Sequence, residues 1–406
     1  MFTQRQWKMI EHAYTTVPFY INLQHIKGID YRDFKSWDDI PVTTKEDLVL
    51  NEDSFISSNA IIRCMQDDLI CCHTSGSTGE SKNIYWSNED MNYSLSPLWL
   101  KRKRYYGINP HDKHCYFFTT RSYGREDVPI EDKGYALGFN KCNLSEERLK
   151  EIWKTMQEFS PVWMNLQPSI ALLLCDVVKK NDLGRIPSLR YMEVTVEMLT
   201  TDMRAYIENT LQVKVVNQYG TIEMNSIAFE YPDGTMRCMN ENCYLEVLDS
   251  KNRSVSANTT GNLCVTTLTN YSMPLIRYKM DDIGSLAYDG NTKTLTLLSG
   301  RSSEYAVDSE GNKINVYVFA RAVENVNCLM EHSIIQFQII QRDVDSFLVR
   351  IVLDEDYREE EIVDAFLDNI WQDSLREAEF TFEFTDKMFP SEETGKHKWF
   401  INEINK

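Results

Sequence analysis

The chain has 406 residues, of which 42% are hydrophobic and 12% aromatic, enough apolar material for one large domain and a smaller one. Its formal net charge of −18 at pH 7 argues against a broad nucleic-acid interface, because phosphate backbones require clustered Lys and Arg. Polar Thr3, Gln4 and Gln6 stand where a signal peptide needs an apolar run, and no apolar stretch is long enough to span a bilayer. Ten cysteines, scattered singly apart from Cys71-Cys72, fit reduced thiols better than a disulfide framework, so we expect a cytoplasmic protein.

The first part of the chain carries signals that alternate between strand and helix. It begins with helical patterning mixed with turn signals at Val17-Pro18 and Ile40-Pro41. A buried strand is predicted over 68–72 and a second strand over 83–86, after which Ser87 is expected to cap a helix. The periodicity then predicts a helix over 144–159, a strand over 162–166, helices over 169–179 and 203–210, and a strand over 214–217. Such alternation favours an α/β core.

From about residue 240 the sequence changes to patterns typical of β-strands, over 244–248, 261–268 and 292–298. A compact unit begins after Gly300-Arg301, where a hairpin is predicted over 304–307 and 313–316. The rest of this unit is expected to contain a helix over 318–326, strands over 333–341 and 346–353, a helix over 359–371 and a strand over 379–384. We therefore predict an α/β fold, with a large N-terminal domain of mixed α/β layers over 1–300 and a small α+β C-terminal domain over 301–406.

A segment rich in Ser, Thr and Gly follows the first predicted strand and is the strongest candidate for a ligand-binding loop. A polyphosphate requires many short donors and close approach of the backbone, and Lys82 would add a positive charge. The spacing differs from that of a Walker A loop, and the simpler alternative is a polar surface loop. The residues of the segment are Thr74, Ser75, Gly76, Ser77, Thr78, Gly79, Glu80, Ser81 and Lys82.

This segment resembles the phosphate loop of the adenylate-forming superfamily of acyl-CoA synthetases, peptide-synthetase adenylation domains and luciferases. A second segment, Tyr219-Gly220-Thr221-Ile222-Glu223, resembles the Tyr-Gly-x-Thr-Glu segment of the same superfamily. The resemblance implies that Tyr219 packs on adenine, that Gly220 and Thr221 belong to the nucleotide site, and that Glu223 helps to hold Mg²⁺ beside the phosphates. An aromatic face suits adenine, and a carboxylate suits a hard cation.

Two motifs further along the chain follow in the order of the superfamily. The segment 277–282 resembles Arg-Tyr-Arg-Thr-Gly-Asp, which implies that Asp282 accepts hydrogen bonds from the ribose hydroxyls. Gly300-Arg301 is similar to the Gly-Arg pair at the domain junction, which implies that Arg301 contacts the nucleotide. By the same resemblance, Ser302 and Ser303 lie at the hinge about which the small, mobile domain rotates.

A Gly-Lys signature near the C-terminus completes the resemblance. Thr394-Gly395-Lys396 implies that Lys396 enters the site and neutralises charge that develops on the α-phosphate and the acyl carboxylate. Lys398 is the alternative for this role if the register differs by two residues.

Segments 14–20, 37–48 and 268–278 narrow the resemblance to the phenylacetate–CoA ligases. The resemblance implies an AMP-forming acid–thiol ligase that uses ATP to convert a carboxylic acid, an aryl or arylacetic one, into acyl-AMP with release of pyrophosphate. The acyl group would then pass to the thiol of CoA. Lys396 and Glu223 would be catalytic, and ATP or AMP, Mg²⁺ and coenzyme A are the expected ligands. We expect a monomer or homodimer with no nucleic-acid or membrane partner.

The sequence departs from the family pattern at several positions. Ile222 replaces the threonine of the pentad, residues 279–281 replace Arg-Thr-Gly, and Ser303 stands where many relatives have Asp or Lys. Residues 194–197 replace a Gly-Gly-Glu-like turn, and residues 119–127 lie where relatives shape the acyl pocket. Two alternatives stay open: a stand-alone adenylation enzyme that loads a carrier protein or an amine, and a nucleotide-binding protein that has lost catalysis.

Three other groups of residues have simpler interpretations. Cys71-Cys72-His73 is expected to form part of a buried strand, because adjacent cysteines are poorly placed for one tetrahedral zinc. Cys238 and Cys243 lack a second well-spaced pair of ligands. The basic run 101–104 is expected on a solvated helix face, with a patch for the phosphates of CoA or for a carrier protein as the alternative.

Overall fold

The computed structural model describes residues 2–60, 69–73, 82–118, 129–141, 144–301, 305–330, 333–354, 357–370, 375, 378–389 and 397–404. The chain forms two compact units, one made of Met1–Pro110 and Gln218–Leu297 and the other of His111–Asn217 and Leu298–Lys406. Each unit therefore combines two segments that are distant in the sequence. None of the described helices has the length and apolar character needed to cross a membrane.

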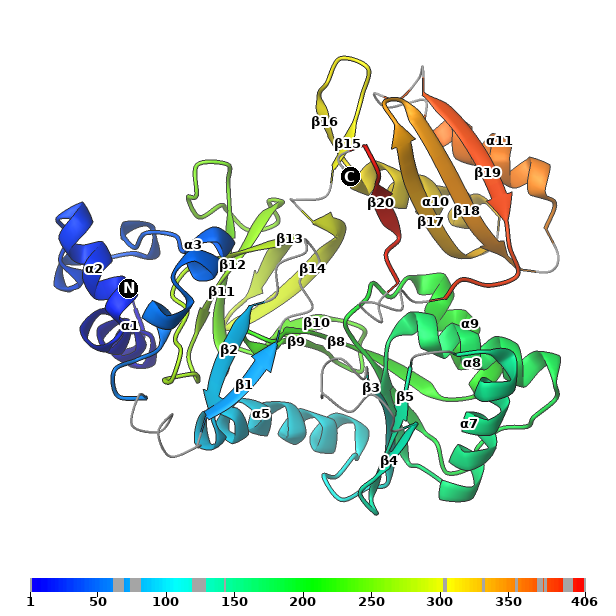
Figure 1. The fold of residues 1–406 in the computed structure, drawn as a ribbon, viewed down its shortest axis with the longest axis horizontal. Helices are drawn as coiled ribbons and strands as arrows, with labels where there is room; N and C mark the ends of the chain where they lie inside the picture. The colour runs from blue at the N-terminus through cyan, green and yellow to red at the C-terminus, as the bar shows by residue number, and fades with distance from the viewer. Residues whose placement is uncertain are drawn as a thin grey trace. The chain divides into compact units, whose positions relative to one another are not determined.

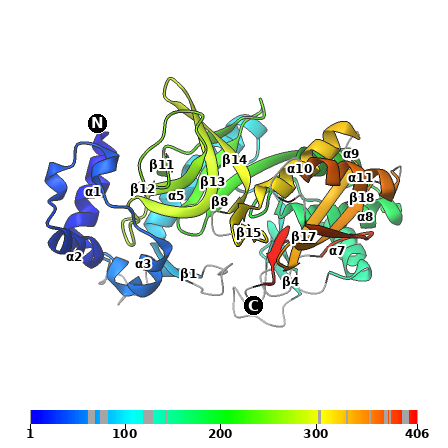
Figure 2. The ribbon, with the colours of Figure 1, turned by 90° about the horizontal axis from the view of Figure 1, so that it is seen from above.

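The first unit begins with two consecutive helices, α1 (Gln4–Thr16) and α2 (Pro18–Lys27) (Figures 1 and 2). Thr3 caps α1 with a capping box, and Pro18 occupies the first turn of α2, where its missing N–H costs no hydrogen bond. The turn signal at Val17-Pro18 thus marks a junction between helices. Short 3₁₀ turns at Tyr31–Asp33, Trp37–Asp39 and Glu52–Phe55 and the helix α3 (Lys45–Leu50) follow.

The strands β1 (Leu69–His73) and β2 (Asn83–Ser87) form an antiparallel pair and confirm the two strands predicted here. The prediction that the first of them is buried was wrong, because Cys71 is exposed and Cys72 is only partly buried. The described part of β1 pairs with β2 alone, so the strand is not enclosed in a larger sheet. Ser87 caps the helix α5 (Asn88–Tyr106) by accepting a hydrogen bond from the Asp90 N–H, as predicted.

The first unit also contains an antiparallel sheet with the strand order β11-β12-β13-β14-β10-β9-β8, to which β8 (Lys214–Thr221) contributes its residues from Gln218 on. The predicted β-rich region is confirmed, but the longest of these strands, β13, was not predicted, because its first residues match the ribose motif and carry several polar side chains. Buried apolar side chains from this sheet, β2, α1 and α2 form one core. The bounds are β9 (Asn225–Glu230), β10 (Met236–Cys238), β11 (Cys243–Leu248), β12 (Gly261–Thr267), β13 (Tyr278–Asp289) and β14 (Thr292–Arg301).

The second unit contains the α/β alternation that the sequence predicted. Parallel strands pair in the order β8-β7-β6-β3-β5, and β4 closes the edge in antiparallel orientation. One face of these strands and the helices α7, α8 and α9 share a core that includes Trp153, Met164 and Met192. The bounds are β3 (His114–Phe118), β4 (Ile130–Asp132), β5 (Ala136–Asn140), α7 (Glu146–Phe159), β6 (Trp163–Leu166), α8 (Pro168–Lys180), β7 (Tyr191–Val194), α9 (Thr201–Leu211) and β8 (Lys214–Thr221).

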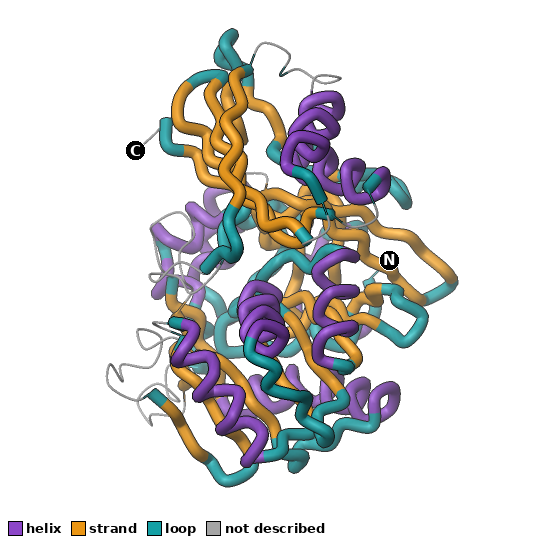
Figure 3. Tube along the Cα trace, turned by 90° about the vertical axis from the view of Figure 1, so that its right-hand side faces the viewer, coloured by secondary structure: helices purple, strands orange, loops and turns teal. Residues whose placement is uncertain are grey.

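The C-terminal part of the second unit contains a hairpin and a sheet with the order β19-β18-β17-β20. Aromatic and aliphatic residues of β18 and β19 lie directly opposite one another, as in the pair Phe347–Phe380, and form a core with α10 and α11. The strands and helices of this part can be followed in Figures 1 and 3. The elements predicted after residue 304 are confirmed within a few residues, and among the described strands of this part β20 alone was not predicted. The bounds are β15 (Tyr305–Val307), β16 (Lys313–Asn315), α10 (Tyr317–Leu329), β17 (Ile334–Asp343), β18 (Ser346–Leu353), α11 (Glu359–Ile370), β19 (Glu379–Phe384) and β20 (Phe400–Asn402).

Candidate functional site

The segment Tyr219 to Glu223 lies where β8 turns back into β9 within the first unit. The register between β8 and β9 shifts at Tyr219 and Gly220, and Asn225 adopts a positive φ of 57° just beyond the turn. A side chain on Gly220 would collide with the carbonyl oxygen of Asn225. Glycine is therefore required here by the close approach of two backbone segments, not only by a family pattern.

The side chains of Tyr219 and Asp282 are joined by a hydrogen bond. The Tyr219 hydroxyl donates to Asp282 Oδ2 over 2.6 Å, although the two residues are 63 positions apart in the sequence. Asp282 lies on β13, a strand that was not predicted from the sequence. This strand places the residue predicted to bind ribose beside the residue predicted to pack on adenine. The short distance is that of a charge-assisted bond, which orients both groups. The structure thus brings together two of the predicted nucleotide residues.

Lys82 and Glu223 form a second contact within the same unit. The Lys82 ammonium lies 3.7 Å from Glu223 Oε1 and donates to the Tyr278 hydroxyl over 2.8 Å. The side chain of Lys82 is only 4% exposed and that of Glu223 only 12%. Burial lowers the pKa of Lys82, while the negative charge of Glu223 acts in the opposite direction. Burial also raises the pKa of the Tyr278 phenol, and the nearby carboxylates of Glu223 and Asp281 add to that effect.

The residues around this contact fit a nucleotide and a hard cation. The Thr221 hydroxyl is buried and has no hydrogen-bond partner among the described residues, so it can serve a ligand. The carboxylate of Glu223 supplies the oxygen ligands that Mg²⁺ prefers, and Lys82 supplies a charge for phosphate. Ile222, the residue of this segment that departs from the family pattern, has an exposed side chain, and its carbonyl accepts a hydrogen bond from the Trp86 indole N–H.

Arg277, the first residue of the ribose motif, has a structural role in this unit. Its guanidinium is 2% exposed and pairs with Glu246 at 3.3 Å and with Asp38 at 3.0 Å, and it donates to the Ile40 carbonyl at 2.8 Å. Burial raises the pKa of the Glu246 carboxyl, while the Arg277 charge acts in the opposite direction. These contacts join the segment after residue 37 to the start of β13, the strand that contains both Tyr278 and Asp282.

Several predicted site residues lie outside the described residues or are described only in part. The phosphate-loop residues Thr74, Ser75, Gly76, Ser77, Thr78 and Gly79, the hinge residues Ser302 and Ser303, and Lys396 are outside the described ranges. The backbone of Arg301 ends β14, and nothing is described of its side chain. Residues 119–127, expected to shape the acyl pocket, also lie outside the described ranges. Their roles stay predictions.

The altered turn at 194–197 has an unusual backbone in the second unit. Val196 adopts a φ of 79°, in the left-handed region that a β-branched residue rarely enters and that glycine adopts without strain. Glu197 accepts hydrogen bonds from the Ser169 N–H at 3.1 Å, the Ser169 hydroxyl at 3.0 Å and the His397 N–H at 2.6 Å. No local pattern of residues indicated these contacts of Glu197, or the hydrogen bond between Lys82 and Tyr278.

The basic run 101–104 does not present its four charges on one open face. Arg102 is buried and packs 4.5 Å from the Trp99 ring, and Lys101 forms a 2.7 Å ion pair with Glu241. The prediction of a wholly solvated face is therefore wrong for Arg102, and the run gives little support to a patch for CoA phosphates. The described cysteines carry free thiols.

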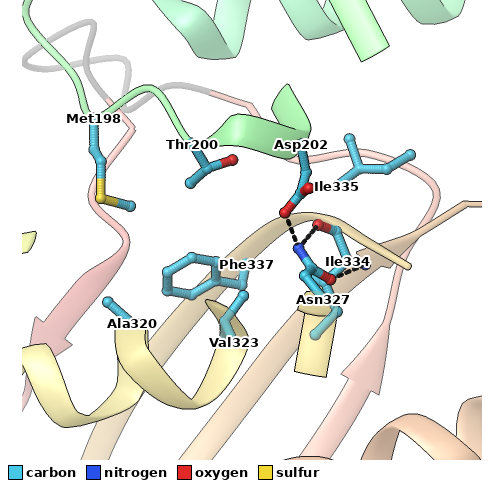
Figure 4. A pocket seen from close by; sticks show the side chains of 9 residues that line it. All are labelled: Met198, Thr200, Asp202, Ala320, Val323, Asn327, Ile334, Ile335 and Phe337. Atoms are coloured by element: carbon cyan, nitrogen blue, oxygen red, sulfur yellow. Dashed lines mark hydrogen bonds between the residues drawn. The ribbon is translucent and has the colours of Figure 1, made fainter. Parts of the chain in front are cut away.

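A small cavity in the second unit is lined mainly by apolar residues (Figure 4). Its volume is about 10 Å³, which is room for one water molecule at most, so it is not a substrate site. Asn327 donates to Asp202 beside it and also bonds the backbone of Ile334, which joins α9 to the C-terminal sheet. The cavity-lining residues are Met198, Thr200, Asp202, Ala320, Val323, Asn327, Ile334, Ile335 and Phe337.

Comparisons with known proteins identify the family that the chain resembles. The model of the family described as AMP-binding enzyme matches residues 37–272, and the model of the CapK C-terminal domain matches residues 306–403. Phenylacetate-coenzyme A ligase of Escherichia coli is 26% identical over 379 residues, which cover 87% of this chain and 82% of that protein. The enzyme of the same name from Thermus thermophilus is 24% identical, over 92% of this chain and 83% of that protein.

Solved structures show the same fold. A crystal structure of 2-hydroxyisobutyryl-CoA ligase, in the postadenylation state and in complex with 2-HIB-AMP, matches with a TM-score of 0.75 at 17% identity. The match covers 98% of this chain and 88% of that one. The AMP-binding model alone spans more than half of the 406 residues and contains Lys82, Tyr219 and Glu223. The chain therefore belongs to the family of AMP-binding enzymes.

Proposed function

We propose that this protein is an ATP-dependent acid–thiol ligase that activates a carboxylic acid, aryl or arylacetic, as acyl-AMP and transfers the acyl group to CoA. The observation that carries the proposal is the pairing of Tyr219 with Asp282 and of Lys82 with Glu223 in one unit. Family membership and two relatives named phenylacetate-coenzyme A ligase, each matched over most of its length, support the reaction and the acceptor.

The first step is an in-line displacement at phosphorus. A carboxylate oxygen of the acid forms a bond to the α-phosphorus of ATP, and the bond from that phosphorus to the bridging oxygen breaks, which releases pyrophosphate. Asp282 and Tyr219 hold the nucleoside, and Lys82 and the phosphate-loop residues hold the phosphates. Mg²⁺, when bound at Glu223, would offset the charge of the phosphates. Lys396 is proposed to stabilise the charge that develops at the reacting centre, so positioning and electrostatics supply the catalysis.

The second step is thioester formation. The CoA sulfur forms a bond to the acyl carbon of the mixed anhydride, the carbon–oxygen bond breaks, and AMP leaves. We propose that the C-terminal domain, residues 301–406, rotates about Ser302 and Ser303 between the two steps and withdraws Lys396. A carrier-protein thiol or an amine is the alternative acceptor, and supplying each acceptor to the preformed acyl-AMP separates the three cases.

The test is a panel of carboxylic acids scored by ATP–pyrophosphate exchange. At least one aryl or arylacetic acid is expected to stimulate exchange, and Lys396→Ala should abolish it while sparing ATP binding. Exchange retained in Lys396→Ala, but lost in Lys398→Ala, would move the role to Lys398. A protein that binds ATP but responds to no acid in a broad panel would refute the ligase and favour a nucleotide-binding protein without catalysis.

A further inference from the structure

Tyr278 lies beside the ion pair of Lys82 and Glu223 in the candidate nucleotide site. Its side chain is 4% exposed, its hydroxyl accepts a hydrogen bond from Lys82 at 2.8 Å, and the Lys82 ammonium lies 5.5 Å from the centre of its ring. The negative charge of the nearby Glu223 carboxylate helps to raise the pKa of the Tyr278 phenol and so to keep it neutral. The family resemblance implies no role for Tyr278, although this residue stands four positions before Asp282 in the same strand.

The backbone of Tyr278 is held firmly, which gives its hydroxyl a defined position. Tyr278 pairs with Val265 of β12 and bridges Thr43, whose N–H and carbonyl bond the backbones of Arg277 and Lys279 at 2.9 Å each. The buried Arg277 precedes it and fixes the same stretch to the core. A hydroxyl held by such a rigid backbone can fix the position of a lysine ammonium. Without a fixed acceptor, the four rotatable bonds of a lysine side chain would let the ammonium move.

The neutral phenol suits the task better than a second carboxylate. An ammonium buried without partners is costly, so Lys82 needs acceptors in place of water. A second carboxylate would supply a hydrogen-bond acceptor, but its negative charge would also offset the positive charge of Lys82 that is needed to bind phosphate. A phenol oxygen accepts the hydrogen bond and leaves the positive charge in place.

We propose that Tyr278 is a positioning residue that aims the Lys82 ammonium at the β- and γ-phosphates of the nucleotide. The proposal rests on the proposed function, since it takes the phosphates of ATP to be the ligand of Lys82. AMP lacks those phosphates, so Tyr278 should distinguish ATP from AMP. A residue needed only for the fold would affect both nucleotides.

Binding measurements on the full chain test this proposal without relying on turnover. Tyr278→Phe keeps the ring and removes the hydroxyl, and it should weaken binding of a non-hydrolysable ATP analogue about 10-fold or more, measured by calorimetry with Mg²⁺, because a hydrogen bond to a charged group is lost. AMP binding should be unchanged. Tyr14→Phe is the matched control, because Tyr14 is a buried tyrosine of the same unit whose hydroxyl has no partner among the described residues.

A double-mutant cycle with Lys82→Met makes the test specific. In the Lys82→Met background, Tyr278→Phe should cause no further loss of ATP-analogue affinity, because the hydroxyl acts through the ammonium. Equal losses for ATP analogue and AMP, additive losses in the double variant, or no loss for either nucleotide would each overturn the proposal. If Tyr278→Phe unfolds, fluorotyrosine at position 278 weakens the acceptor while keeping the hydroxyl, and the same selective loss is expected. These outcomes do not depend on finding the acid, so they are separate from a failure of the ligase assay.

Discussion

Replacing Arg277 by Met removes a buried charge from the centre of the first unit while keeping much of the side-chain volume. The Arg277 and Glu246 side chains are only 2% and 3% exposed, and their closest nitrogen and oxygen atoms are 3.3 Å apart. The substitution leaves the Glu246 carboxylate buried without its cation and also removes the bond to the Ile40 carbonyl. Loss of one partner of a buried ion pair costs about 3–5 kcal/mol, so we expect the free energy of unfolding to fall by that amount. Asp38, whose side chain is 46% exposed, should contribute little of this.

The assay is urea unfolding followed by tryptophan fluorescence, with Arg253→Met as the matched control. Arg253 forms a 3.2 Å ion pair with Asp249, but its side chain is 66% exposed, so its loss should cost about 0.5 kcal/mol or less. Adding Glu246→Gln to Arg277→Met should recover part of the stability, because the amide needs no cation. Equal effects of Arg277→Met and Arg253→Met, or no recovery in the double variant, would refute the reasoning.

The pH dependence of Arg277→Met gives a second check on the same pair. Burial raises the folded-state pKa of Glu246, and the Arg277 charge opposes that shift, so the substitution should raise this pKa further. Between the unfolded and the folded pKa, the folded state binds more protons than the unfolded state, so stability falls as pH rises through that window. The variant should therefore lose less stability at acidic pH than at neutral pH, relative to the parent. A loss that is independent of pH would mean that Glu246 is not the source.

Two further predictions concern the nucleotide site. Asp282→Asn should weaken AMP binding about 10-fold or more, because it removes the charged acceptor proposed for the ribose hydroxyls, which also accepts the 2.6 Å hydrogen bond from Tyr219. Unchanged AMP affinity in calorimetry would contradict this role of Asp282. Asp281 raises the pKa of Lys82 and Lys45 lowers it, so Asp281→Asn should move the alkaline limit of ATP-analogue binding to lower pH and Lys45→Met should move it to higher pH. Shifts in the same direction would show that the limit reports another group.

Local patterns in the sequence were sufficient for much of the fold. The helices α7, α8 and α11 and the strands β17 and β18 carry strong periodicity, and their predicted bounds differ from the observed ones by a few residues. The cap at Ser87 depends on residues within one helical turn and was also predicted. The motifs follow one another in the order found in the family that they resemble. Each of them also supplies a chemical group that a nucleotide requires.

Only the tertiary structure decided how these groups meet. Tyr278 and Lys82 are 196 positions apart, and Arg277 reaches Asp38 from 239 positions away, so no local pattern carries either contact. The strand β13 escaped prediction because the alternation of Tyr278, Lys279, Met280 and Asp281 breaks at Asp282, a carboxylate where the pattern requires an apolar residue, and pairing with β12 stabilises the strand in spite of it. Sequence alone therefore determined which groups are available for nucleotide chemistry, whereas pairing between distant strands decided their positions and added Tyr278 to the set.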